Sequence, residues 1–162
     1  MASRRKGRIL AFQALYSWDT RYSQTGDTSI PEGLLDFSWA LNDTSQNETF
    51  LDEKMTAFSR FLVQGTIENI LVIDNTIQNH LQNWEHKRLN RVDLAILRMS
   101  VYTLMFQDEI PPSVVIDEAV EISREFGADD SYRFVNGVLD SVRKTIAGTN
   151  LAKASETART GK

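Results

Sequence analysis

Four cations lie within five residues near the start of the chain: Arg4, Arg5, Lys6 and Arg8. The formal net charge of the protein is -4, so the chain as a whole has no general attraction for polyanions. A local cluster of cations in such a chain indicates a focused contact with phosphate. The aromatic residues Phe12, Tyr16 and Trp18 follow directly. The cations and the rings together make nucleic acid the candidate ligand.

The three aromatic residues also have a simpler interpretation. Rings at near-helical spacing are individually more typical of a hydrophobic core than of a platform for stacked bases. Tyr16 is the strongest exception, because its hydroxyl group needs water or a hydrogen-bond partner. For the cations, the competing explanation is a disordered basic start, which the aromatic segment behind them makes less favourable.

A strongly acidic segment lies between residues 108 and 130, where eight carboxylates accompany one cation, Arg124. Asp117, Glu121 and Glu125 recur every four residues and would form one stripe on a helix. Such a stripe can build a metal or acid-base site, but a solvated face is far more common. A docking surface for a basic protein is the third interpretation. We expect this segment and the basic start to bind different partners.

The sequence contains no catalytic or metal-binding motif. There is no cysteine for a disulfide or a thiolate site, and His80 and His86 lack the spacing of a metal-ligand pair. Glycine-rich phosphate loops, nucleophile elbows and zinc-protease motifs are also missing. We therefore predict no catalytic residue, no metal and no cofactor. The polar N-terminal segment and the short apolar runs predict a cytoplasmic protein without a signal peptide or a membrane span.

Apolar residues recur at three- and four-residue spacing through most of the chain, with only three prolines and eight glycines, so we predict an all-α fold. A first helix is expected from a cap at Ser3 to about residue 22, and a short helix is expected around Pro31. A helical pattern then runs from about residue 48 to residue 84, in which Gly65 marks either a bend or close helix packing.

Three more helices are predicted in the second half of the chain. The first covers residues 92–107, and the second reaches from a cap at Ser113 to residue 126, with Gly127 as its stop. The last begins at Asp129 or Asp130 as its cap and ends near residue 147.

We expect these helices to form two subdomains in one compact bundle. The N-terminal subdomain covers residues 1–86 and includes the basic arm, the C-terminal subdomain covers residues 87–147, and residues 148–162 form a flexible tail. Residues 42–49 are also expected to be flexible, and the basic residues 86–91 connect the two halves. The dipole and the free N–H groups of the first helix add positive potential beside the four cations.

Five segments together resemble the NusB family of bacterial transcription antitermination factors. They are QALYSW at 13–18 after the Arg-rich start, AILRMSVY at 95–102, PSVVIDEA at 112–119, EFGADDS at 125–131 and FVNGVLD at 134–140, the last being the most specific. They cover about half of the chain in the family's order. Residues 23–53 show no clear family pattern, Thr103 stands where the family often has glutamate, and Asp93 is shorter than the glutamate often found there.

The resemblance implies an all-α, non-enzymatic protein that binds the boxA element of nascent ribosomal RNA together with NusE, a protein of the small ribosomal subunit, within the transcription elongation complex. It also implies the roles of individual residues. Arg4, Arg5 and Arg8 correspond to arginines that contact phosphate, and Tyr16 and Phe134 correspond to aromatic residues that contact RNA. Asp93 corresponds to an acid near the bases, and Asp130 and Arg133 flank Phe134. Glu118 and Glu121 are candidate contacts for NusE.

Two alternatives stay open at the level of the sequence. A related domain is fused to RNA methyltransferases, so the chain could be a detached RNA-binding module of that kind. It could also be a purely protein-binding helical adaptor, for example a homodimer that hides the basic patch.

Overall fold

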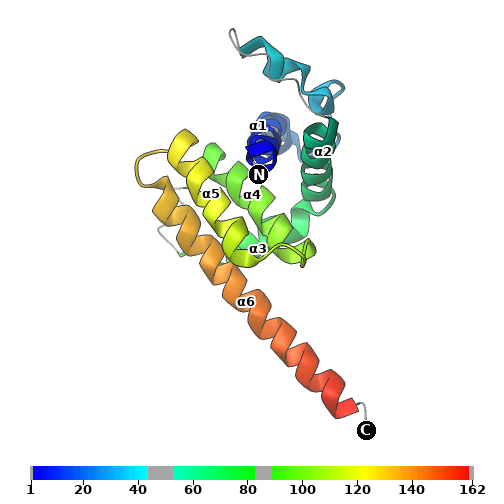
Figure 1. Cartoon of the computed structure of the whole chain (residues 1–162), viewed down its shortest axis with the longest axis vertical. Helices are drawn as coiled ribbons and strands as arrows, with labels where there is room; N and C mark the ends of the chain where they lie inside the picture. The colour runs from blue at the N-terminus through cyan, green and yellow to red at the C-terminus, as the bar shows by residue number, and fades with distance from the viewer. Residues whose placement is uncertain (1, 44–52, 83–88, 161–162) are drawn as a thin grey trace.

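A computed structural model of the chain describes residues 2–43, 53–82 and 89–160. Within them the secondary structure consists of α1 (Ala2–Thr25), η1 (Leu34–Asp36), η2 (Ser38–Asp43), α2 (Glu53–Glu68), α3 (Ile70–Asn79), α4 (Arg91–Phe106), α5 (Pro112–Phe126) and α6 (Ser131–Thr160), where η marks a 3-10 helix. The described residues contain no strand, which confirms the predicted all-α fold (Figure 1).

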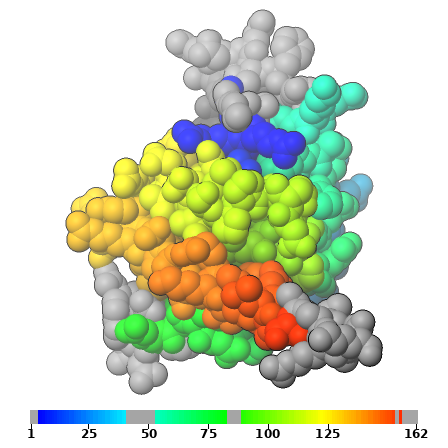
Figure 2. All heavy atoms as spheres, turned by 60° about the horizontal axis from the view of Figure 1, so that its bottom comes forward, coloured from blue at the N-terminus to red at the C-terminus, as the bar shows by residue number. Residues whose placement is uncertain are grey.

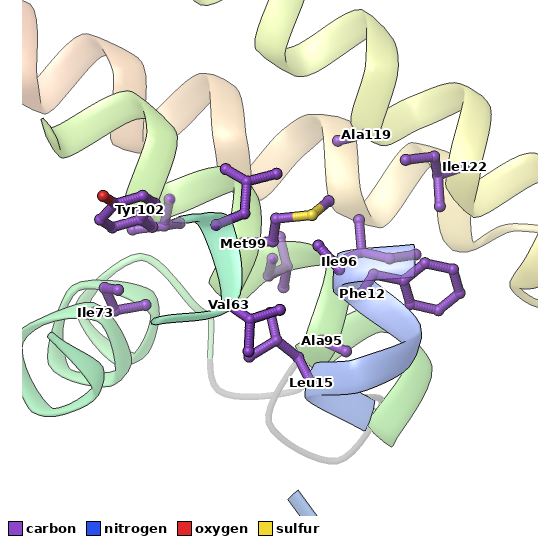
Figure 3. Close-up of a cluster of buried hydrophobic side chains, with 14 of the residues drawn as sticks. Phe12, Leu15, Val63, Ile73, Ala95, Ile96, Met99, Tyr102, Ala119 and Ile122 are labelled. Carbon is purple, nitrogen blue, oxygen red and sulfur yellow. The ribbon is translucent and has the colours of Figure 1, made fainter. Parts of the chain in front are cut away.

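Helix α4 is the centre of the fold, since it packs against α1, α2, α3, α5 and α6. From Ala95 to Leu104 its side chains are buried on every side, as expected for a helix enclosed by neighbours. Figure 3 shows the resulting core, in which Leu15 of α1, Val63 of α2 and Ile96 of α4 lie close together. The hydrophobic interior is therefore continuous across the helices that hold the candidate site.

Helices α2 and α4 approach each other closely at Gly65. A Cβ atom placed on Gly65 would lie 2.2 Å from Cζ of Tyr102, so only glycine fits under this ring. Helix α2 continues through Gly65 and ends at Glu68, after which Asn69 separates it from α3. The prediction of close helix packing at Gly65 is confirmed, and the alternative prediction of a bend at that residue is wrong.

The N-terminal half differs from the prediction at several helix ends. Helix α1 already includes Ser3, which is therefore not its cap, and it continues to Thr25. The short helix expected around Pro31 is replaced by η1 and η2, which follow it. Residues 44–52 and 83–88 lie outside the described residues, and with them most of the stretch 42–49 and of the segment 86–91.

In the C-terminal half, local capping chemistry explains the starts of α4 and α5. Asn90 caps α4, because its Oδ1 accepts a hydrogen bond of 2.8 Å from the backbone N–H of Asp93. Helix α5 begins at Pro112, so the predicted cap at Ser113 is wrong. Proline is well suited to the first turn of a helix, where its missing N–H has no intrahelical partner.

Helix α6 does not end near residue 147 as predicted but continues to Thr160, and its C-terminal part projects from the rest of the molecule (Figure 1). Its N-terminal half is anchored by the buried residues Val135, Val138, Leu139 and Val142. Once a helix is anchored, each further residue adds a backbone hydrogen bond at low cost, so an exposed extension can remain helical.

The boundary between the two predicted subdomains cannot be drawn at α4 itself, because α4 contacts helices that precede it and helices that follow it. The division into two subdomains therefore stays a prediction. Among the described residues, no helix combines the length and the apolar character needed to cross a membrane.

Candidate nucleic-acid interface

The first turns of α1 carry the four cations, which we call the N-terminal cluster: Arg4, Arg5, Lys6 and Arg8. Arg4 and Arg8 are one turn apart and both lie over the ring of Phe58 on α2, with their guanidinium carbons 4.8 and 5.5 Å from the ring centroid. Gly7 permits this approach, since a Cβ atom there would be 2.7 Å from Phe58 Cδ1. Sequence reasoning missed Phe58, because only the packing of α2 on α1 brings it to the cluster.

Arg5 points to the other side, toward Glu118 on α5. Arg5 Nε donates to Glu118 Oε2 at 3.1 Å, and Arg5 Nη2 donates to Glu118 Oε1 at 3.2 Å. Arg8 Nη1 lies 3.9 Å from the same Oε2. Figure 2 shows the blue first turns of α1 lying between yellow α5 and turquoise α2. The acidic segment and the basic start, which can hardly bind the same polyanion, are thus in direct contact with each other.

Charge and burial distinguish these arginines. The hydrogen bonds and the charge of Glu118 raise the pKa of Arg5, and the same contacts lower the pKa of Glu118. Burial lowers the pKa of Arg8, whose side chain is only 12% exposed, against 50% for Arg5. Arginine remains charged at neutral pH in either case. Arg5 is therefore accessible but already paired, whereas Arg8 is largely covered.

Tyr16 lies further along α1, beside shallow hollows at the ends of α4 and α5. One hollow is lined by Phe12, Gln13, Tyr16, Val92 and Phe126, and the adjoining one by Tyr16, Asn90, Arg91, Val92, Phe126, Gly127 and Ala128. Tyr16 and Phe126 are 39% and 36% exposed, whereas Phe12 and Trp18 are buried. The core interpretation of the three rings is confirmed for Phe12 and Trp18, and Tyr16, named as the strongest exception, is exposed.

Arg91 brings a positive charge to these hollows. Its guanidinium carbon lies 4.8 Å from the centroid of the Tyr16 ring, and its Nη2 donates to the Tyr16 carbonyl oxygen at 3.2 Å. The same nitrogen donates to Thr20 Oγ1. Arg91 and Phe126 were not among the predicted site residues, although Arg91 belongs to the basic segment 86–91 and Phe126 to a segment of the resemblance.

Asp93 is only 3% exposed, so in this structure it is not an acid that faces a base. Its Oδ2 accepts from Ser131 Oγ at 3.2 Å and from Asn90 Nδ2 at 3.2 Å. Ser131 Oγ in turn accepts from the backbone N–H of Ala128 at 3.0 Å. Asp93 thus joins the start of α4 to the start of α6 and holds the loop that lines the hollow.

The first turn of α6 carries the remaining predicted residues. Asp130 is exposed and directly precedes α6, and its carbonyl oxygen accepts from the N–H groups of Arg133 and Phe134. Arg133 is exposed, and its Nε donates to the Tyr132 hydroxyl at 2.9 Å. Phe134 is half-buried at the edge of the core.

The candidate site residues form two groups along α1 and its neighbours. The N-terminal cluster is one group and contains the predicted Arg4, Arg5 and Arg8. The second, which we call the junction site, consists of Tyr16, Asn90, Arg91 and Phe126, of which only Tyr16 was predicted. The other predicted residues, on the first turns of α4 and α6, lie outside both groups. Arg5 and Tyr16 are eleven residues apart, about 16 Å along the axis at 1.5 Å per residue. That spacing places them on one side of α1, since eleven residues complete about three turns.

The acidic stripe Asp117, Glu121 and Glu125 is exposed, in keeping with a solvated face. Glu121 pairs only loosely with Arg124 at 3.6 Å. In the described part of the chain, no three histidine or carboxylate side chains are grouped in a way that could hold a metal ion.

Comparison with known proteins identifies close relatives. The NusB family model matches residues 5–144. The transcription antitermination protein NusB of Treponema denticola is 49% identical over 140 residues, which cover 86% of this chain and 95% of the relative. Among solved structures, T. maritima NusB matches with a TM-score of 0.68 at 35% identity, covering 87% of this chain and 90% of that one. A crystal structure of the antitermination factors NusB and NusE in complex with dsRNA matches with a TM-score of 0.71 at 26% identity, covering 90% and 98%.

Proposed function

The chain belongs to the NusB family, and we propose that it is an RNA-binding transcription antitermination factor that recognises boxA-type RNA in nascent ribosomal transcripts together with NusE. In this role it acts in the cytoplasm, as part of the elongation complex and without catalysing a reaction. The observation that carries the proposal is the placement of Arg5 of the N-terminal cluster and Tyr16 of the junction site on one side of α1, with Arg91 beside the Tyr16 ring.

The two groups supply complementary kinds of contact. Cations of the N-terminal cluster neutralise phosphates, which gives affinity with little dependence on base sequence. At the junction site, the exposed rings of Tyr16 and Phe126 offer stacking surfaces for an unstacked base. The side-chain amide of Gln13 lines one of the hollows beside Tyr16 and can donate to or accept from base edges, whereas the Asn90 amide is engaged in capping α4.

The first turn of α6 extends this surface. Arg133 adds an exposed cation, and the helix N-terminus adds the positive end of a helix dipole. Phe134 presents the exposed part of its ring beside Arg133, which suits it to contact a base. Asp93 acts indirectly in this assignment, by fixing the loop before α6 through Ser131.

For the NusE contact, the exposed acids of α5 remain the candidates, because they suit a basic partner. Glu121 is exposed and only loosely paired, whereas Glu118 is engaged by Arg5. If NusE and RNA bind together, each must raise the affinity of the protein for the other by the same factor.

The decisive experiment is filter binding of a boxA-type RNA and a shuffled RNA of equal length, with and without NusE, at two salt concentrations. We expect tighter binding of the boxA-type RNA, a further gain with NusE, and weaker binding at higher salt. Equal binding of both RNAs under all conditions would contradict the assignment. Methyl transfer to RNA would support the methyltransferase alternative, and an RNA-independent protein complex would support the adaptor.

A further inference from the structure

We propose that Glu118 occupies the position of an RNA phosphate in the free protein and competes with RNA for Arg5. This inference rests on the proposed function, since it concerns the same RNA surface. It assigns Glu118 a role that limits RNA affinity, in place of the NusE contact expected from the sequence.

The geometry of the contact carries the proposal. Glu118 uses both carboxylate oxygens, and Arg5 uses Nε and Nη2, at 3.1 and 3.2 Å. This is the bidentate arrangement in which a guanidinium also holds two oxygens of a phosphate group. One edge of Arg5 that could hold a phosphate is therefore filled by an acid of the same chain.

Glu118 also reduces the positive charge of the rest of the cluster. Its Oε2 lies 3.9 Å from Arg8 Nη1, so one carboxylate faces two of the three arginines predicted to contact phosphate. Glu121 and Glu125 add negative charge on the same helix near Arg5. The negative charge of these acids repels an RNA backbone that approaches Arg5. To bind Arg5, an RNA phosphate must displace the carboxylate of Glu118.

The contact is weak enough to be replaced. The side chains of Arg5 and Glu118 are 50% and 20% exposed, so water and salt screen the pair. The two side chains can separate without opening the core, because Arg5 lies on the first turns of α1. A pair of this kind should reduce RNA affinity by a factor of about two to five.

The test is the substitution Glu118→Gln, which keeps the size of the side chain and removes its charge. Affinity for a boxA-type RNA is measured by filter binding at 0.15 M salt, with thermal unfolding to check the fold. We expect the affinity to rise by about two- to fivefold. The matched control is Glu121→Gln, which removes one negative charge from the same helix. Glu121 pairs with Arg124 and not with Arg5. Its effect should be smaller, because the Debye length at this salt is about 8 Å.

A second pair of variants separates competition from positioning. In an Arg5→Ala protein, Glu118→Gln should give a smaller gain than in the wild-type background, because the contested arginine is gone and only Arg8 still faces Glu118. An unchanged or reduced affinity of the Glu118→Gln single variant, with wild-type unfolding, would overturn the inference and make Glu118 a positioning residue for Arg5. Failure of the wild-type protein to prefer the boxA-type RNA would instead refute the proposed function, and this inference with it.

Discussion

The arginines of the N-terminal cluster differ in how far each guanidinium can reach a ligand. Arg8 is covered, Arg5 is held by Glu118, and Arg4 is exposed above the ring of Phe58. We therefore expect identical side chains within two helical turns to contribute unequally to phosphate binding. The resemblance implied a phosphate contact for each of the three arginines, and the neighbours on α2 and α5 make their accessibility different.

Arg4→Ala should weaken RNA binding without affecting the fold, because Arg4 is exposed and rests on a half-buried ring. If Arg4 contacts one phosphate, the slope of log affinity against log salt should become shallower by about 0.7. The control is Arg21→Ala, which removes an arginine paired with Asp27 near the other end of the same helix. An unchanged slope for Arg4→Ala would place Arg4 outside the interface.

Tyr16 should contribute through its ring rather than its hydroxyl group, since the ring is exposed beside Arg91 and Phe126. We expect Tyr16→Ala to lose about 1–3 kcal/mol of RNA binding and Tyr16→Phe to retain most of it. Titration with fluorescent boxA-type RNA measures both. Phe61→Ala is the control, since Phe61 is an exposed aromatic residue on α2. Equal losses for Tyr16→Ala and Phe61→Ala would argue against a specific stack.

At the scale of helices, the fold depends on close approaches that small residues permit. Gly65 allows α2 to pack under Tyr102, and Gly7 allows α1 to approach Phe58. Helix ends are set by equally local features, such as the Asn90 cap and Pro112 at the start of α5. These contacts position the junction site, because α4 begins at Arg91.

Gly65→Ala should destabilise the protein by about 1–3 kcal/mol, because the added methyl group would have to displace the Tyr102 ring or separate two helices. Gly137→Ala is the matched substitution inside α6, where nothing lies within 4 Å of the added Cβ. It should stabilise the protein by up to about 1 kcal/mol, because alanine has the higher helix propensity. Urea unfolding of both variants measures the difference, and equal effects would contradict the close packing.

At the scale of the molecule, Arg98 of α4 connects helices that are far apart in the sequence. Its Nη1 donates to Asp19 Oδ1 of α1 at 2.7 Å, and its Nε and Nη2 donate to both carboxylate oxygens of Asp74 of α3 at 2.8 and 2.9 Å. Burial lowers the pKa of Arg98, but these hydrogen bonds outweigh the burial and the pKa is raised. A single buried cation thus links three helices.

Arg98→Met should reduce the free energy of unfolding by about 3–5 kcal/mol, because Asp19 would remain buried without its main cationic partner. Adding Asp19→Asn should recover part of the loss. The control Arg143→Met breaks only an exposed pair with Asp140 on α6 and should cost less than about 1 kcal/mol. Urea unfolding distinguishes them, and a small effect of Arg98→Met would show that the network is not required for stability.

The sequence by itself determined the all-α class, the approximate course of most helices, and a core interpretation of the aromatic residues of α1 to which Tyr16 was the strongest exception. These features follow from residue spacing along a single helix, which is local information. The tertiary structure alone decided that Arg5 meets Glu118, 113 positions away, and that Asp93 is buried against Ser131. Helical periodicity indicates which residues face inward, but the partner opposite each residue depends on how the helices pack.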